Sequence, residues 1–351
     1  MYAALTQAGE WIYAAQASTT HHTFLCPKCH QPVKLKQSHK GTWYFAHQTA
    51  CQKIAHPKRD YAETEWHQAA KRLFYQEGRR IGIDVKCEHW FDKIQQAADI
   101  YLPQQQLVIE CQHSPISAKQ LKQRTNGYRQ CGVKVIWLMD ANNKQTLSTW
   151  HKTMLHSQQG NYFWRMLDVP NKKVHIFSEL PLFYRKGCAH YQYDCVTVAD
   201  WLKNQGALLE GKQKIERNAP VTKSYERQLQ QIRRQTIYQR SIGALYEKGI
   251  LLQQLPKWIL TDEWQCLLLK MPCWEFFAWI YAVMNSMKQP FTANEIKRQL
   301  KEVPFIKTID APFIEGDKWH TLVQAALSVF HHYQLVVPIG FETWQMIPKS
   351  V

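Results

Sequence analysis

Between residues 63 and 140 the hydrophobic positions change from a helical to a strand-like period. From Glu63 to Tyr75 the apolar side chains cluster on one side of a helix, at Trp66, Ala70, Leu73 and Phe74. Three strand-like runs follow, at Ile81–Val85, Ala97–Leu102 and Leu107–Cys111. A second helix is predicted at Ser117–Gln130, and a further strand-like run at Val133–Met139. The last run is apolar throughout, which is typical of a central buried strand. This order predicts an α/β (α+β) domain with a small central sheet.

The residues before this domain form a compositionally unusual segment. Short strand-like runs are visible within the first 60 residues, at Thr23–Leu25, Val33–Leu35 and Thr42–Phe45. This segment holds too few apolar residues for an independent core, so a bound metal or another cross-link is expected to stabilise it.

Beyond residue 155 the pattern is mainly helical. The stretch Lys212–Arg240 is polar and helical in character, and Thr292 and Glu295 have the spacing of a capping box. A helix is predicted over Asp317–His332, before a hairpin around Pro338, and this order is similar to a winged-helix arrangement. The predicted domains are a module at 1–58, an α/β domain at 59–155 and a mainly helical domain at 156–351.

Composition narrows the class of protein. Lys and Arg number 44 against 28 Asp and Glu, which gives a formal net charge of +16 with His neutral. Such an excess attracts polyanions, either nucleic acid or an anionic membrane surface. An aromatic share of 13% excludes a disordered basic tail.

Three further features concern the compartment. The first residues lack the basic and apolar regions of a secretory signal. The most apolar window, Leu267–Met284, is interrupted by Lys270 and Glu275, which favours a buried helix pair over a membrane span. Ten Cys are too sparse for a disulfide scaffold, so we expect a cytoplasmic protein whose thiols are free or bound to metal.

Cys and His residues in the first segment have the spacing of a zinc site. Cys26 and Cys29 form a C-x2-C knuckle, and His47 and Cys51 follow beyond the strand-like run 42–45. Three thiolates and one imidazole satisfy tetrahedral Zn²⁺, and a filled ligand shell indicates a structural role in a zinc-ribbon-like module. A redox dithiol is the alternative interpretation.

An acidic constellation lies in the α/β domain. If the runs 97–102 and 107–112 form a hairpin, Leu102 lies opposite Leu107 and Asp99 lies opposite Glu110. Directly opposed residues have Cβ atoms about 4.5–5.5 Å apart, and carboxylates that close repel each other unless a cation such as Mg²⁺ or Mn²⁺ lies between them. Strand alternation places Gln112 on the face of Glu110. The alternative is a cross-strand pair on a solvated sheet face.

Charged residues of the two flanking helices can serve such a site. Glu63, His67 and Lys71 recur every four residues and therefore share a helix face. That face can offer a further metal or water ligand and a phosphate contact, although an ordinary exposed face has the same pattern. The second helix carries three candidate DNA-binding residues, Lys119, Lys122 and Arg124. A metal at Asp99 and Glu110 would suit phosphodiester hydrolysis.

Taken together, these residues resemble the competence protein CoiA family. The resemblance covers about residues 1–140 and rests on motifs met in order along the chain. They are Cys26-x2-Cys29, Phe45-Ala46-His47 before Cys51, Glu63-Thr64-Glu65-Trp66-His67-x3-Lys71, Ala98-Asp99-Ile100, Ile109-Glu110-Cys111-Gln112-His113-Ser114, Arg124-x3-Tyr128 and Val135-Ile136-Trp137-Leu138.

The resemblance implies a nuclease-like domain of the PD-(D/E)XK type, which is a mixed sheet flanked by helices with a divalent metal at its D…E-x-K constellation. It implies Asp99 and Glu110 as ligands of Mg²⁺ or Mn²⁺ and Glu63 as the carboxylate of the first helix. It also implies a role in natural transformation, acting on incoming DNA inside the cell. Gln112 stands in the usual place of Lys, and an amide orients water or phosphate without adding positive charge.

The stretch Lys212–Arg240 adds eight Lys or Arg against two Glu. We interpret it as a DNA-tracking helix, with Arg233 and Arg234 as phosphate contacts. A solvated helix face is the alternative.

Two functions remain in view. One is a metal-dependent deoxyribonuclease of the competence system. The other is a non-catalytic DNA-binding mediator that keeps a nuclease fold and delivers DNA, single strands included, to a recombinase or another competence protein. An intact Asp99 and Glu110 pair favours the enzyme, whereas Gln112 favours the mediator.

Overall fold

The chain was analysed as a computed structural model. The structure describes residues 3–14, 16–17, 23–27, 29–39, 41, 43–48, 64–141, 149–206 and 213–348. Contacts group the chain into two compact units, and each is described by itself. The first comprises residues 1–143, 165–175 and 195–208, and the second comprises 144–164, 176–194 and 209–351. The three domains predicted above stay a prediction, because these units divide the segment after residue 155 differently.

The N-terminal module is a small antiparallel sheet of five strands, in the order β2-β1-β3-β4-β5. The strands are β1 (Ala3–Leu5), β2 (Trp11–Tyr13), β3 (Phe24–Leu25), β4 (Pro32–Gln37) and β5 (Trp43–His47). The three predicted runs correspond to β3, β4 and β5, while β1 and β2 were not expected. The core is correspondingly small: Phe24 and Phe45 pack with ring centroids 4.9 Å apart beside Val33 and Cys26.

The region after the module begins with a long helix and three antiparallel strands. These elements are α1 (Glu65–Arg80), β6 (Lys86–Phe91), β7 (Gln96–Leu102) and β8 (Leu107–Gln112). Thr64 caps α1 by accepting a hydrogen bond from the His67 amide. The predicted strand Ile81–Val85 is wrong: the left-handed backbone of Gly82 (φ 75°) ends the helix there, and pairing starts only at Lys86.

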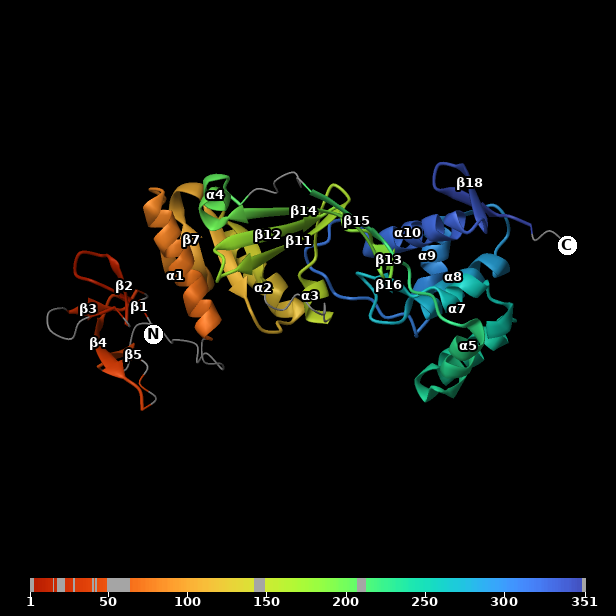
Figure 1. The fold of residues 1–351 in the computed structure, drawn as a ribbon, viewed down its shortest axis with the longest axis horizontal. Helices are drawn as coiled ribbons and strands as arrows, with labels where there is room; N and C mark the ends of the chain where they lie inside the picture. Colours follow the sequence, from red (N-terminus) through yellow and green to blue (C-terminus); the bar gives the residue numbers. More distant parts are fainter. Residues whose placement is uncertain are drawn as a thin grey trace. The chain divides into compact units, whose positions relative to one another are not determined.

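A second helix and a parallel strand complete this region. They are α2 (Ala118–Gln130), with a capping box at Ser117, and β9 (Lys134–Asp140). Strand β9 pairs with β8 in parallel, so the four strands form a mixed sheet in the order β6-β7-β8-β9. The predicted order of helix, three strands, helix and strand is therefore present, with β6 in place of the predicted strand Ile81–Val85. Figure 1 labels α1, β7 and α2 of this region.

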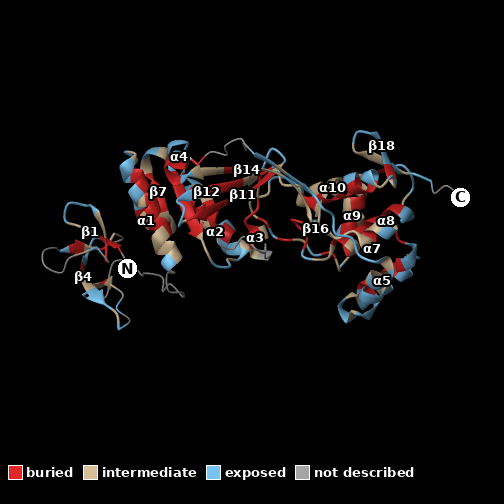
Figure 2. Cartoon of the chain, in the orientation of Figure 1, coloured by how far each residue is buried: buried red, intermediate tan, exposed pale blue. Residues whose placement is uncertain are grey.

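The two helices cover opposite faces of this sheet. On one face the Cys87 thiol donates to the carbonyl of Lys71 in α1. Cys87 pairs with Ile100, and the next residue, Tyr101, faces the other way because strand side chains alternate. On that second face Tyr101 packs against Tyr128 of α2. Both faces are buried, which Figure 2 shows for β7 and the strands beside it.

Further strands, which the sequence analysis did not predict, extend the sheet. Its full order is β15-β14-β12-β11-β9-β8-β7-β6, with β10 paired to β11. The added elements are β10 (His156–Gln158), β11 (Asn161–Asp168), β12 (Lys173–Ser178), β14 (Cys188–Thr197) and β15 (Gln213–Asn218), with α3 (Thr149–Thr153) and α4 (Val198–Lys203) between them.

The basic stretch 212–240 differs from its prediction as a single helix. Its first half includes β15, which pairs with β14, and its second half holds α5 (Tyr225–Arg234) and the start of α6 (Gln239–Glu247). The Lys and Arg side chains of this stretch are therefore divided between β15, where successive side chains point to opposite faces, and the separate short helix α5.

The rest of the second unit is mainly helical. It contains β13 (Phe183–Arg185), α7 (Lys257–Thr261), β16 (Trp264–Cys266), α8 (Cys273–Ser286), β17 (Phe291–Thr292), α9 (Ala293–Lys301), α10 (Lys318–His332), β18 (Val336–Gly340) and β19 (Thr343–Met346). Helix α8 is buried along most of its length, so the apolar window Leu267–Met284 holds one buried helix and not the predicted pair. In the part of the chain that the structure describes, no helix combines the length and apolarity that a membrane crossing needs.

The predicted C-terminal elements are present. The Thr292 and Glu295 capping box starts α9, Asp317 caps α10, and the terminal hairpin is β18–β19. Strand β17 joins this hairpin, so the elements follow one another in the order α8-β17-α9-α10-β18-β19. The winged-helix arrangement stays a prediction.

Candidate active site and metal centre

Three carboxylates lie at the same level on neighbouring strands. Glu88 lies between the pairs Cys87–Ile100 and His89–Ala98, at the level of Asp99, and the pairing of β7 with β8 runs from Leu102–Leu107 to Ile100–Ile109, one residue short of Asp99 and Glu110. The predicted register of β7 and β8 is thus confirmed as far as the pairing runs. Glu88 was not expected, because its left-handed backbone (φ 52°) interrupts β6.

Asp99 is held on the α1 side of the site. Its Oδ2 accepts a hydrogen bond from the Cys111 amide at 3.0 Å and lies 3.5 Å from Nε2 of His67. Burial by itself would raise the pKa of Asp99, but the hydrogen bond from His67 and the charges of His67, Lys71 and Arg124 outweigh it. The pKa of Asp99 is therefore well below its usual range, and the group is an anion at neutral pH.

Glu110 is held on the α2 side. Its Oε1 accepts from Arg124 Nη2 at 2.6 Å and from the Tyr128 hydroxyl, and the residue is 3% exposed. Burial raises the pKa of Glu110 to about 7, against the opposing effect of Arg124. The Asp99 carboxylate contributes to the same rise. Two carboxylates on adjoining strands thus have pKa values driven apart, as in sites that divide acid and base roles.

Helix α2 reaches Glu110 because it lies close to the sheet. A Cβ at Gly127 would meet Oε1 of Gln96 at 2.9 Å, so glycine permits this approach. Gln96 also donates to the carbonyl of Arg124 at 2.9 Å. The close packing directs the Arg124 guanidinium to Glu110, whereas the sequence analysis assigned Arg124 to DNA.

The third carboxylate, Glu88, is paired with Lys71. The Lys71 Nζ lies 2.6 Å from Glu88 Oε1, and both side chains are buried. Lys71 and His67 share the predicted helix face, but the Lys71 ammonium points into the protein. It acts on Asp99 through its charge, because it is among the groups that lower the pKa of that carboxylate.

Gln112 ends β8 at the edge of the site. Its Nε2 donates to the carbonyl of Ser114 at 2.6 Å, and so it shapes the loop that leaves the strand. The next residue, His113, places Nδ1 at 2.9 Å from Oδ2 of Asp140, the last residue of β9. The ring of His113 stacks on Trp66 of α1, with centroids 5.4 Å apart.

The remaining predicted site residues are distributed as follows. Lys119 and Lys122 lie on the exposed face of α2. Arg233 and Arg234 are exposed on α5, and Arg233 donates to Oε1 of Gln253 at 2.7 Å. Glu63 and Cys51 lie outside the described residues.

The sequence analysis missed the roles of Glu88, Tyr128 and Asp140. Counting the register outward through a second hairpin would have placed Glu88 beside Asp99. Tyr128 lies four residues after Arg124, so both project from one face of α2. Asp140 carried no comparable signal, because its partner depends on the parallel pairing of β8 with β9.

The Cys and His residues of the N-terminal module converge. The ligand atoms of Cys26, Cys29 and His47 all lie within 4.8 Å of one another, and among the described residues no other group of three such ligands is this compact. Cys29 Sγ lies 3.2 Å from His47 Nε2. Burial lowers the pKa of His47, which favours the neutral imidazole that binds metal. Two thiols and one imidazole suit a metal such as zinc.

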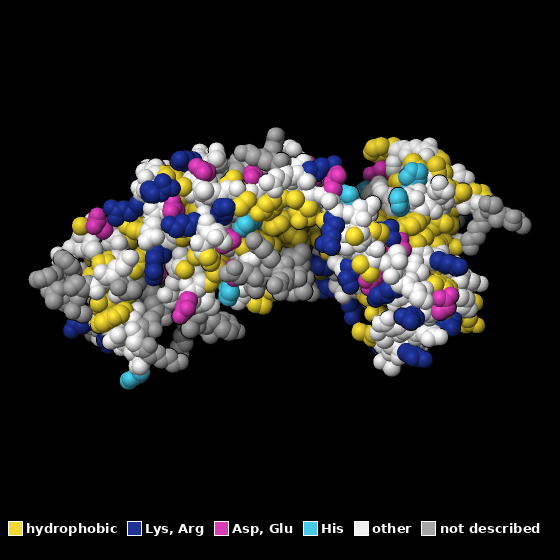
Figure 3. All heavy atoms as spheres, in the orientation of Figure 1, with side chains coloured by type: hydrophobic (Ala, Val, Ile, Leu, Met, Phe, Trp, Pro, Cys, Tyr) yellow, Lys and Arg dark blue, Asp and Glu magenta, His cyan; other side chains and the backbone are white. Residues whose placement is uncertain are grey.

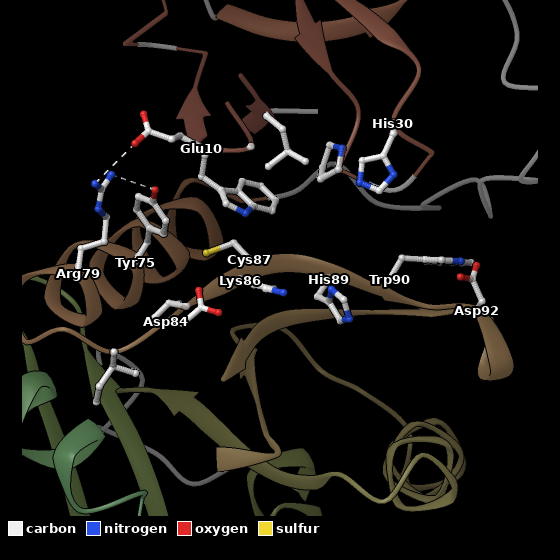
Figure 4. A pocket seen from close by; sticks show the side chains of 16 residues that line it. Glu10, His30, Tyr75, Arg79, Asp84, Lys86, Cys87, His89, Trp90 and Asp92 are labelled. Atoms are coloured by element: carbon white, nitrogen blue, oxygen red, sulfur yellow. Dashed lines mark hydrogen bonds and ion pairs between the residues drawn. The ribbon is translucent and has the colours of Figure 1, made fainter. Parts of the chain in front are cut away.

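A separate hollow of about 560 Å³ lies between the module and the edge strand β6 (Figure 4). Arg79 reaches from α1 to the Tyr75 hydroxyl at 3.4 Å and to Glu10 at 3.9 Å. Its lining holds three carboxylates and two permanent cations, namely Glu10, Asp84, Asp92, Arg79 and Lys86. The lining includes neither Asp99 nor Glu110 and lacks the positive excess of a phosphate-binding groove.

Comparison with known proteins was made for the whole chain. Residues 63–206 match the family described as competence protein CoiA, nuclease-like domain, and residues 12–53 match competence protein CoiA, N-terminal domain. No curated protein and no solved structure matches the chain. The two matched regions contain the Cys and His cluster and the row of carboxylates, and they follow one another in the order expected of one family. The chain belongs to the competence protein CoiA family.

Proposed function

We propose that this protein is a metal-dependent deoxyribonuclease that acts on incoming DNA in natural transformation. The observation that carries the proposal is the pair Asp99 and Glu110, which lie on adjoining strands of a nuclease-like fold with pKa values driven in opposite directions. Structural ion pairs seldom need two opposed carboxylates, whereas a divalent cation does.

The donor set fits Mg²⁺ or Mn²⁺. The hydrogen bonds described above use one oxygen of each carboxylate, Oδ2 of Asp99 and Oε1 of Glu110. The second oxygen of each residue would hold the ion, and carboxylate oxygens are the ligands that these hard cations prefer. When bound, such an ion polarises the phosphate and lowers the pKa of water.

The protein's own residues orient this pair. His67 and the Cys111 amide hold Asp99, while Arg124 and Tyr128 hold Glu110. Lys71 lends positive charge from within the protein, and Gln112 shapes the rim of the site. Glu63 is proposed as the carboxylate that α1 adds, as the family resemblance implies.

Cleavage of labelled single-stranded and double-stranded DNA, with Mg²⁺ or Mn²⁺ added to the zinc-loaded protein, tests the proposal. We expect metal-dependent cleavage that Asp99→Ala and Glu110→Ala each reduce by at least about 100-fold, while DNA binding persists. Asp92→Asn, which changes an exposed carboxylate after β6, is the matched control and should cleave like the parent. Normal DNA binding without cleavage under any metal would contradict the proposal.

A second function is favoured by one observation. Gln112 stands where related nucleases carry Lys, and Arg124 already pairs with Glu110. Glu110 and Arg124 can therefore stabilise the fold without taking part in catalysis. On that alternative the protein is a mediator that binds DNA and passes it to a recombinase. It predicts that Asp99→Asn leaves both DNA binding and transformation frequency unchanged in a strain that carries the variant.

The N-terminal module is proposed to bind a structural Zn²⁺ through Cys26, Cys29 and His47, with Cys51 as the fourth ligand. The convergence of the first three ligands supports this assignment. DNA contacts are proposed at Lys119 and Lys122 of α2 and at Arg233 and Arg234 of α5. On the face drawn in Figure 3, Lys and Arg side chains are spread among Asp and Glu, which favours contacts at separate points.

A further inference from the structure

We propose that His113, held by Asp140, is the general acid of this site and protonates the leaving oxygen of the cleaved phosphodiester. The proposal rests on the proposed nuclease function and adds a residue to it. It starts from the hydrogen bond between His113, which follows β8, and Asp140, the last residue of β9.

The position of the pair follows from the strand pairing. Gln112 lies opposite Met139 in the parallel ladder, so His113 and Asp140 are the next residues on their strands. Both strands run in the same direction, and their carboxyl ends meet at one edge of the sheet. In open α/β sheets this edge is where ligands bind.

The geometry of the pair suits proton transfer. Asp140 is 2% exposed, while the His113 side chain is 35% exposed. A carboxylate only accepts hydrogen bonds, so Nδ1 of His113 carries the hydrogen that faces Asp140. The other ring nitrogen, Nε2, is then the one that exchanges a proton with a substrate, as in the histidines that carboxylates orient in hydrolases.

Trp66 connects this pair to the row of carboxylates. Its ring stacks on His113 at a 25° angle and meets the ring of His67 edge-on, with centroids 5.7 Å apart. His67 in turn contacts Asp99. His113 therefore lies one indole ring away from the His67 and Asp99 pair, at the rim of the proposed site.

Trp66 is also held firmly in this place. Its indole Nε1 is buried and has no hydrogen-bond partner within the part of the chain that the structure describes, so the ring is positioned by its contacts with His113 and His67.

The other polar groups of the site are committed elsewhere. Gln112 does not titrate, Lys71 is buried against Glu88, and Arg124 keeps its proton at every accessible pH. Asp99 and Glu110 are the proposed metal ligands, and His67 faces Asp99. Among the site residues that the structure describes, His113 is then the titratable group that can face a leaving oxygen.

The step balances as hydrolysis. The oxygen of water bonds to phosphorus while the bond from phosphorus to the leaving oxygen breaks. The leaving oxygen takes the Nε2 proton of His113 and departs as an alcohol. The proton released by the attacking water restores His113 through solvent, so the products are a phosphomonoester and a hydroxyl end.

The test compares two substrates that differ in one atom. The first is a natural oligonucleotide, and the second carries sulfur in place of the bridging oxygen at the bond that is cut. A thiolate departs without a proton, so it does not need the acid. His113→Gln should reduce kcat on the natural substrate by roughly 10²–10⁴-fold and on the sulfur substrate by less than about tenfold.

Two further variants complete the experiment. Asp140→Asn should show the same substrate-selective loss at smaller amplitude, because it disturbs only the orientation of His113. Asp99→Ala should lose activity on both substrates. Thermal unfolding of each variant confirms that it is folded.

An equal loss on both substrates in His113→Gln, or no loss on either, would overturn the proposal while leaving the nuclease function in place. If the parent protein cleaves neither substrate, the nuclease function fails, and the role of His113 fails with it. The two failures are therefore distinguishable by the parent protein alone.

Discussion

Asp99 and Glu110 are chemically similar groups on adjoining strands, yet their neighbours shift their pKa values in opposite directions. Glu110 is buried and Asp99 is half-buried, and removal from water favours the protonated form of each. Around Asp99 the hydrogen bond and positive charges outweigh burial, whereas around Glu110 burial and the nearby anion prevail over Arg124. At the scale of a residue, the number and placement of cations decides which carboxylate stays ionised.

The first prediction concerns the stability that Asp99 provides. Its pKa in the folded protein is below the value of about 3.9 in an unfolded chain, so its contribution is present above that pH and is lost as the pH falls. Asp99→Asn should therefore lower the free energy of unfolding at pH 7, and the difference from the parent should shrink below about pH 4. Urea unfolding of parent and variant without added divalent metal measures the loss of stability at pH 7 and its decrease at pH 3.5.

A difference between parent and Asp99→Asn that is constant with pH would contradict this account. It would mean that the asparagine disturbs packing and not ionisation. The variant Asp92→Asn serves as the control, because this exposed carboxylate lies outside the row.

How far the site could be predicted also depends on the residue in question. The register of β7 with β8, from Leu102–Leu107 to Ile100–Ile109, followed from counting along one hairpin, which is a local property of the sequence. The pairing of Glu110 with Arg124 did not follow from such counting, because it depends on the close approach of α2 to the sheet at Gly127. Contacts that depend on how a helix packs on a sheet have no signature in sequence spacing alone.

At the scale of elements, the buried pair of Lys71 and Glu88 links α1 to the edge strand β6. Removing one partner of a buried ion pair leaves an uncompensated charge, which costs about 3–5 kcal/mol. Lys71→Met should therefore lower the free energy of unfolding by about that amount. Urea denaturation measures the change.

The double variant Lys71→Met with Glu88→Gln provides the control, because it removes both charges. It should recover a large part of the lost stability. If the double variant is as unstable as Lys71→Met, the ion pair does not explain the effect, and the Lys71 stem must act through packing.

The elements that sequence patterns missed have a common cause. In β6 the left-handed Glu88 and the charged neighbours break the alternation that identifies a strand. Strand β11 is buried along nearly its whole length, so it shows no alternation of polar and apolar residues. By contrast α1, α2, α9 and α10 begin at capping residues, which are local and readable.

At the scale of the whole molecule, we expect the N-terminal module to depend on the proposed zinc ion. Its core comprises a few small side chains besides Phe24, Val33 and Phe45, which is too little to stabilise a domain. Cys26→Ser should therefore lose the bound zinc and unfold the module, leaving the rest of the chain folded. Metal analysis of the purified protein, together with proteolysis of the first 60 residues, measures both effects.

Cys188→Ser is the matched control, because Cys188 lies in β14, away from the cluster. The parent and this variant should each hold one zinc ion. An undamaged parent protein without zinc would contradict the proposed metal centre.

The net charge of +16 is also a property of the whole molecule. If α2 and α5 both hold DNA, the logarithm of the binding constant should fall linearly with the logarithm of salt concentration. Lys119→Gln with Lys122→Gln should weaken binding and reduce that slope by about 1–2, and Arg233→Gln with Arg234→Gln should do the same.

Filter binding at several salt concentrations measures the slope. Lys86→Gln changes a cation in the hollow of Figure 4, whose lining holds more carboxylates than cations, and should leave the slope unchanged. An unchanged slope in both double variants would place the DNA contacts elsewhere on the molecule.

The central claim is that Asp99 and Glu110 together bind a divalent cation, and Mn²⁺ binding followed by electron paramagnetic resonance tests it most directly. With the zinc site filled, the parent protein should bind one Mn²⁺ that Mg²⁺ displaces, and Asp99→Asn and Glu110→Gln should each abolish that binding while Asp92→Asn retains it. A parent protein that binds no Mn²⁺, or variants that bind it as well as the parent does, would contradict the account.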